Sequence, residues 1–138
     1  AIYCSTERGF ELRAAAGCDG LAPILDPDDP LVLYPRSIRS LVSLRDVPIP
    51  RAKLTAGKTA LTTALPVVGG NKIYAVVLYG EHRGGEPIDR EEERLLLRLA
   101  HSAANAYAHL LLLERERQIA VLRSQLNLPA STTAAAQD

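Results

Sequence analysis

The chain has 138 residues, a length that allows one ordinary domain and not comfortably two. Its 16 Lys and Arg balance 16 Asp and Glu, and the lack of a basic surplus argues against a nucleic-acid groove or an anionic membrane surface as partner. Hydrophobic residues make up 47%, enough for a core, and no apolar run reaches membrane-spanning length, so we expect no nucleic-acid partner and no direct membrane insertion. The absence of Met, even at position 1, suggests a piece of a longer protein.

The two cysteines, Cys4 and Cys18, are too few for a disulfide framework or a metal site. Cys4 has the same strand parity as Ile2, which predicts a small buried side chain that points inward. We therefore expect an intracellular, cytoplasmic domain, in a parent protein that could be anchored in a membrane upstream.

Residues 1–6 and 10–16 are short apolar runs around a Glu-Arg-Gly turn, which predicts a hairpin with Cys4 opposite Glu11. Prolines then interrupt residues 17–63 and exclude long regular elements there. We expect a short helix over 29–37 and an extended run over 40–46. This is the region in which a pocket wall or lid would be built.

Residues 64–80 carry the clearest strand signal, two apolar runs separated by Gly69-Gly70-Asn71. The second run is apolar at both parities, with Ile73, Ala75, Val77 and Tyr79 on one side and Tyr74, Val76 and Leu78 on the other. Such a strand is covered on both faces. We expect helices on one face of the sheet and another cover, or a pocket, on the other.

A long helix is predicted over residues 89–126, about 57 Å in length. Asp89 is a good N-cap, and Glu92 three residues later completes a capping box. Apolar residues then recur at steps of three and four, at Leu95, Leu96, Leu99, Ala103, Ala106, Leu110 and Leu113.

This pattern lapses over 114–117 and returns out of phase at Ile119, Leu122 and Leu126. A slipped heptad is typical of a helix that enters a coiled coil, and the alternative is a helix that frays after Leu113. We expect the dimer and signalling contacts at Leu110, Leu113, Ile119, Leu122 and Leu126. Residues 129–138 are expected to be disordered.

The sequence shows no catalytic or metal-binding constellation. The three histidines, His82, His101 and His109, lack the four-residue spacing at which two helical histidines share a metal ion. There is no Gly-x-Ser-x-Gly elbow, and Gly57-Lys58-Thr59 lacks the first glycine of a phosphate loop. We therefore expect no enzyme, no metal and no haem, and this absence favours binding or regulation.

Residues 64–112 resemble a GAF domain, the PAS-related small-molecule sensor of bacterial signalling proteins. Pro66-Val67, the run 74–80 and the helical pattern 96–106 match that family's hairpin and helix, and residues 1–17 resemble its first hairpin. The resemblance implies an α+β (α/β) domain, with an antiparallel sheet of about five or six strands, helices on one face and a long C-terminal helix. It divides the chain into a domain at 1–109, a helical extension at 110–128 and a tail at 129–138.

The chain departs from the family at its N-terminus and at Ala75, which stands where the family usually has Gly, and it lacks the motifs of three ligand-specific subclasses. It begins on a strand where the family has a helix, and the uncovered sheet face would favour dimerisation. Asn71-Lys72 precedes the central strand and Ile88 replaces a Phe, so cyclic nucleotides are not supported. Asp46-Val47-Pro48 matches only half of the bilin signature, and two dispersed cysteines do not fit a sulfoxide reductase.

The resemblance places a ligand pocket between the sheet and the short helix after Asp28. Its expected lining is Tyr34, Arg36, Arg39 and Tyr74, where the two arginines would clamp an anionic group. The alternative is two surface arginines and a core tyrosine. The implied function is a non-catalytic regulatory domain that binds an unidentified small molecule and forms a homodimer through its helices. A ligand-free structural dimerisation module is the alternative.

Overall fold

The computed structural model describes residues 1–56, 59–82 and 84–126. The chain divides into two compact units, Ala1–Tyr107 and Ala108–Asp138, and each is described by itself. The expected disordered tail at 129–138 lies outside the described residues.

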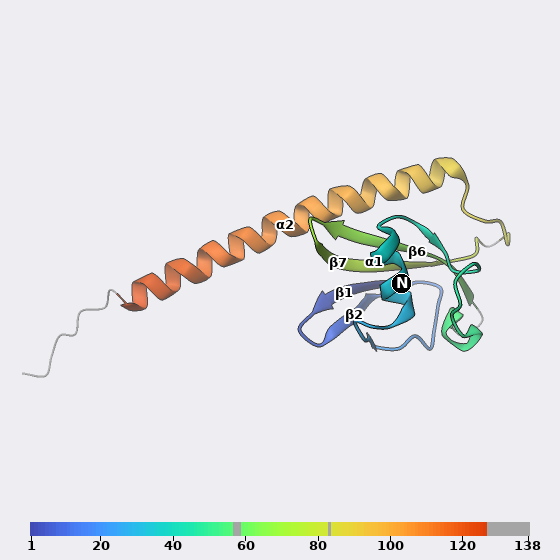
Figure 1. The fold of residues 1–138 in the computed structure, drawn as a ribbon, viewed down its shortest axis with the longest axis horizontal. Helices are drawn as coiled ribbons and strands as arrows, with labels where there is room; N and C mark the ends of the chain where they lie inside the picture. The colour runs from blue at the N-terminus through green and yellow to red at the C-terminus, as the bar shows by residue number, and fades with distance from the viewer. Residues whose placement is uncertain (57–58, 83, 127–138) are drawn as a thin grey trace, which may run out of the picture. The chain divides into compact units, whose positions relative to one another are not determined.

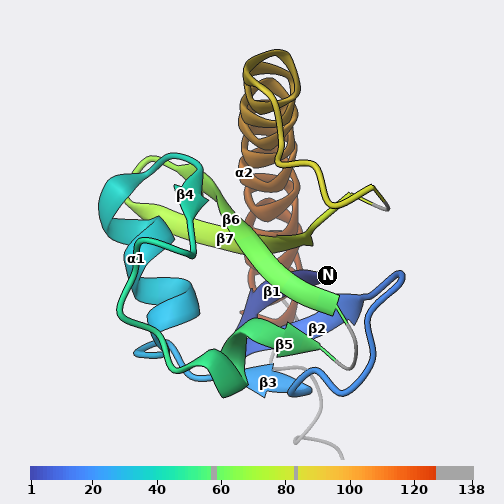
Figure 2. The same ribbon diagram turned by 90° about the vertical axis from the view of Figure 1, so that its right-hand side faces the viewer.

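The first unit has an α+β fold, as predicted, built on an antiparallel sheet (Figures 1 and 2). The strands follow the spatial order β3-β2-β1-β7-β6-β4, and the short β5 pairs with the start of β6. The bounds are β1 Ile2–Thr6, β2 Gly9–Ala14, β3 Ile24–Leu25, β4 Val42–Ser43, β5 Thr55–Ala56, β6 Thr59–Gly69 and β7 Lys72–Gly80. The helices are α1 Pro30–Ile38, the 3-10 helix η1 Arg51–Leu54 and α2 Arg90–Leu126.

Two hairpins supply most of the sheet. In the first, Cys4 lies opposite Glu11, as predicted. In the second, Gly70 occupies the tight turn with φ of 59°, a left-handed conformation that glycine adopts without steric cost. β6 begins at residue 59 rather than 64, because its first residues pair with β5.

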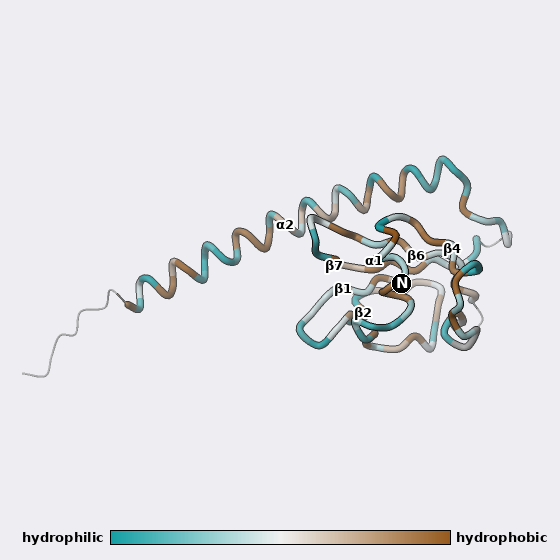
Figure 3. Tube along the Cα trace, viewed as in Figure 1, coloured by the Kyte–Doolittle hydropathy of each residue, from teal (hydrophilic) through white to brown (hydrophobic). Residues whose placement is uncertain are grey.

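The core lies on both faces of the sheet, because β7 is apolar at both parities. On one face, Val76 and Leu78 pack with Leu31 and Val32 of α1. On the other face, Ala75 packs with Ala100 and Ala104 of α2. The two helices therefore cover opposite faces, which differs from the prediction that helices share one face (Figure 1). The hydropathy colouring marks apolar stretches in β6 and β7 (Figure 3).

A β-bulge in β7 changes the expected alternation of side chains. Val67 of β6 pairs with Ala75, but Val68 pairs with Ile73, so Tyr74 is an extra residue in β7. Ile73 consequently packs with the α1-side core, whereas Tyr74 packs with the α2-side core. The prediction of Tyr74 on the same face as Val76 and Leu78 is therefore wrong.

Both helices begin with the caps that their sequences encode. The Asp29 carboxylate accepts a hydrogen bond from Leu31 N at 2.9 Å at the start of α1. At the start of α2, Asp89 Oδ1 accepts from Glu92 N at 2.8 Å and Glu92 Oε2 accepts from Asp89 N at 2.9 Å. This reciprocal pair is the predicted capping box.

The face of α2 that packs on the sheet is narrower than predicted. It is formed by Leu96, Leu97, Ala100, Ala103, Ala104 and Tyr107. Leu95 and Leu99 are 50% and 57% exposed, although they belong to the predicted apolar series. Small alanines let the helix approach the strands closely, so the larger leucines at the neighbouring positions are left outside the contact.

Candidate functional site

A cavity of about 360 Å³ lies on the α1 side of the first unit. It is lined by Tyr3, Gly20, Leu21, Ala22, Ile24, Leu25, Asp26, Asp29, Leu31 and Lys53. These residues come from β1, the segment that includes β3, the start of α1 and η1. We call this space the α1-side cavity. Only Leu31 of the lining belongs to α1, so the cavity lies at the start of that helix, beside β1 and β3.

Tyr3 forms the apolar floor of this cavity and also brings a hydroxyl to it. Its side chain is 1% exposed, and Tyr3 OH donates a hydrogen bond to Ala22 O at 2.8 Å. Burial raises the pKa of the Tyr3 phenol above its ordinary value, and the nearby Cys18 and Asp29 raise it further. The phenol is thus held in its neutral, hydrogen-bonding form.

Asp29 and Lys53 form the charged part of the lining. Lys53 Nζ lies 2.6 Å from Asp29 Oδ2, and the Asp29 side chain is only 10% exposed. The other oxygen of this carboxylate caps α1, so a single side chain links the helix to η1. The Lys53 side chain is 47% exposed and can turn toward solvent or toward a bound molecule.

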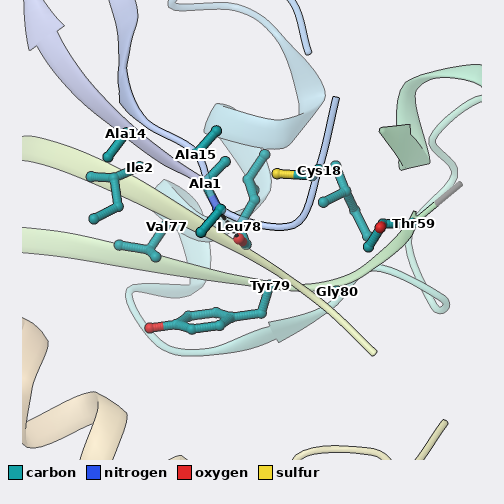
Figure 4. Close-up of a pocket in the computed structure, with 12 residues that line it drawn as sticks. Ala1, Ile2, Ala14, Ala15, Cys18, Thr59, Val77, Leu78, Tyr79 and Gly80 are labelled. Carbon is teal, nitrogen blue, oxygen red and sulfur yellow. Dashed lines mark hydrogen bonds between the residues drawn. The ribbon is translucent and has the colours of Figure 1, made fainter. Parts of the chain in front are cut away.

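A second cavity, of about 380 Å³, lies near Ala1 (Figure 4). Its lining is mostly small and apolar: Ala1, Ile2, Ala14, Ala15, Ala16, Cys18, Thr59, Leu61, Val77, Leu78, Tyr79 and Gly80. Thr59 Oγ1 already donates to Gly17 O at 2.8 Å. Both linings include a tyrosine, Tyr79 in the Ala1-side cavity and Tyr3 in the α1-side cavity, but only the α1-side lining adds the carboxylates of Asp26 and Asp29 and the Lys53 amine.

The expected pocket residues are not brought together. Tyr34 packs partly buried against the α1-side core, and Arg36 is exposed in the last turn of α1. Arg39, with φ of 58°, ends α1 and donates from its guanidinium to Gly70 O in the β6–β7 turn. Tyr74 lies on the opposite face of the sheet. The lining of the α1-side cavity includes none of these four residues.

Tyr74 belongs instead to a cluster with Tyr107, in the part of α2 that packs on the sheet. Its ring stacks on the Tyr107 ring with centroids 5.7 Å apart and planes inclined by 12°, and Lys72 Nζ lies 5.8 Å from the Tyr74 centroid. The Cys4 sulfur lies 3.3 Å from Tyr107 OH. This contact with Cys4, together with burial, raises the pKa of Tyr107. The cluster fixes Tyr107 against β1 and β7.

The sequence reasoning missed Tyr3, Asp29 and Lys53 as cavity residues. Tyr3 has the strand parity opposite to that of Ile2 and Cys4, and it is Tyr3 that is buried, whereas Cys4, which was expected to be buried, is only partly buried. The Asp29–Lys53 pair joins residues 24 positions apart, with α1 and β4 between them, and no periodic pattern links the two residues.

The predicted helix contacts lie in the second unit, where α2 is exposed at each of them. At about 100° per residue, the nine positions from Leu110 to Ile119 amount to about half a turn around the helix axis. Leu110 and Leu113 therefore lie on one side, and Ile119, Leu122 and Leu126 on the other. A straight helix cannot place all five in one seam.

Across the described residues, no group of three His, Cys, Asp or Glu side chains is placed to hold a metal ion. Nor, within those same ranges, is any helix long and apolar enough to cross a membrane. Comparisons of the chain with family models, with curated proteins and with solved structures found no match.

Proposed function

We propose that the first unit is a non-catalytic sensory domain of the GAF type, which binds a small molecule in the α1-side cavity. The observation that carries the proposal is the composition of this cavity. An apolar floor formed by Tyr3 and Leu25 meets a few convergent polar groups, and a volume of about 360 Å³ falls within the usual range for small-molecule sites. The resemblance of residues 1–112 to the GAF family supports the same assignment.

The chemistry of the lining indicates the kind of ligand. Leu21, Ile24 and Leu25 would contact an apolar or aromatic body. A polar group on the ligand would compete for the Asp29–Lys53 pair, accepting from the Lys53 amine or donating to the Asp29 carboxylate. Because Asp29 also caps α1, a ligand that engages this carboxylate acts directly on the start of that helix.

The domain would work in the cytoplasm, within a bacterial signalling protein, and α2 would relay its state. Ligand binding would shift the self-association of α2 in a homodimer. The exposed leucines and isoleucine of the second unit support this role, since such side chains are stabilised by a partner helix.

A ligand-free structural dimerisation module is the second candidate. The observation that favours it is the internal pairing of Asp29 with Lys53, which satisfies the charged lining without a ligand. In that case the cavity would hold only solvent, and dimerisation would not respond to any metabolite.

Native mass spectrometry of the protein purified from cells tests these two candidates. A sensor is expected to retain a co-purified mass, and Ala22→Trp is expected to abolish it by filling the α1-side cavity. Ala15→Trp is the matched control, because it places the same side chain in the Ala1-side cavity from another exposed alanine.

Loss of the bound mass in Ala15→Trp alone would assign the ligand to the Ala1-side cavity and contradict the proposed site. A dimer with no bound mass, and with no thermal shift against a metabolite panel, would favour the structural module.

A further inference from the structure

The second unit carries an apolar seam on one side of α2. Leu112, Ile119, Leu122 and Leu126 follow the heptad spacing of a and d positions, and Arg115 takes the remaining d position. The four apolar side chains are exposed by 58%, 49%, 57% and 83%. We call this set the 112–126 seam.

We propose that the 112–126 seam pairs with the same seam of a second copy of this chain in antiparallel orientation. The inference rests on the proposed self-association of α2, and its new content is the orientation. Charge complementarity decides between the two orientations, because parallel and antiparallel pairs bring different flanking residues together.

In a parallel pair, identical layers of the seam face each other. Arg115 would then meet Arg115 of the second copy inside the seam, where two like charges repel. The flanking Glu116 would lie beside Leu111 of the other helix, and Arg123 beside Gln118. Neither flanking position would gain an ion pair.

In an antiparallel pair, residues at heptad positions a face residues at heptad positions d of the other helix. Ile119 then packs against Leu122 of the second copy, and Arg115 lies beside Leu126 at the end of the overlap, which runs from residue 115 to residue 126 and leaves Leu112 outside it. There its aliphatic stem covers the leucine while its guanidinium reaches water. The flanking residues also become complementary. Glu116 of each helix lies beside Arg123 of the other, which gives two ion pairs per dimer, and Gln118 of each helix lies beside Gln125 of the other.

The reciprocal variants Glu116→Arg and Arg123→Glu test the orientation in the full chain. In an antiparallel dimer, each variant alone replaces two attractive pairs by two repulsive ones. Surface pairs of this kind should weaken dimerisation about tenfold. An equimolar mixture of the two variants restores attraction, since the arginine that one variant carries at position 116 then faces the glutamate that the other carries at position 123. Sedimentation equilibrium and native mass spectrometry would detect this heterodimer.

Glu114→Arg is the matched control, because it makes the same charge change on the helix side away from the seam and should leave the dimer constant within about twofold. Recovery of affinity in the mixture, but not in either variant alone, supports the antiparallel pair.

A dimer that neither variant weakens would overturn the orientation and leave self-association in place. A wild-type chain that sediments as a monomer across the accessible concentration range would overturn both. Retention of ligand mass by that monomer would show that the sensor proposal survives without the dimer.

Discussion

The Tyr3 ring is part of the core of the first unit, and its hydroxyl donates a hydrogen bond to Ala22 O in the lining of the α1-side cavity. Tyr3→Phe removes the donor to Ala22 O and leaves that carbonyl without its partner. We expect a loss of about 1 kcal/mol in the free energy of unfolding near neutral pH, measured by urea denaturation. Tyr107→Phe provides the comparison and should cost less, because its partner is the weakly bonding Cys4 sulfur.

The same variant should also change the alkaline behaviour of the protein. The pKa of Tyr3 is raised in the folded state, so above the ordinary tyrosine value of 10.0 the unfolded chain releases this proton first. Stability due to the neutral phenol is complete below that pH and is lost as the pH rises through the folded pKa. The stability difference between wild type and Tyr3→Phe should therefore shrink above about pH 10. A difference that stays constant across this range would contradict the expectation.

At the scale of the element, α1 depends on one carboxylate with two roles. Asp29→Asn keeps an oxygen for the cap but removes the charge that Lys53 contacts, whereas Asp29→Ala removes both interactions. We expect Asp29→Ala to cost about 1–2 kcal/mol, and Asp29→Asn to cost less, in urea denaturation. Equal losses in the two variants would show that the ion pair rather than the cap stabilises this helix.

The close approach of α2 to the sheet depends on alanines. Ala104 is 1% exposed, so Ala104→Leu must push α2 away from β6 and β7, at a cost of about 1–3 kcal/mol. Ala106→Leu makes the same chemical change at an exposed position of the same helix and should alter stability by less than about 0.5 kcal/mol. Thermal unfolding of both variants would check the difference.

At the scale of the whole molecule, the balance of charges sets the solution behaviour. The chain has a formal net charge of zero at pH 7 and a pI of about 7.1. Repulsion between copies is therefore weakest near neutral pH, and we expect solubility to pass through a minimum there. Static light scattering should show the most attractive interactions near pH 7 and weaker attraction at pH 5 and pH 9.

The parts of the fold that could be predicted are those with a local cause. The first hairpin, the Gly70 turn and the capped α2 follow from turn residues, caps and periodic apolar positions. The two-residue strands β3 and β4 are too short to show any period, so their pairing depends on tertiary contacts. The placement of helices on opposite faces likewise follows from packing rather than from pattern.

The composition of the candidate site could not be predicted from the sequence. The bulge at Tyr74 could not be read from the sequence, because an extra residue leaves the apolar character of both faces unchanged. It moves Tyr74 from the expected pocket to the α2 face. Conversely, Lys53 reaches Asp29 only because the irregular segment between α1 and η1 folds back, which no local rule specifies.

The stacked pair of Tyr74 and Tyr107 has an optical consequence. The chain contains five tyrosines and no tryptophan, so tyrosine dominates its near-ultraviolet absorption. One ring belongs to β7 and the other to α2, and they are held 5.7 Å apart at a fixed angle. Two chromophores in this arrangement couple and produce a chiral signal that vanishes when either ring rotates. Near-ultraviolet circular dichroism therefore monitors the docking of α2 on the sheet in the unlabelled protein, and the signal can be compared before and after a ligand is added.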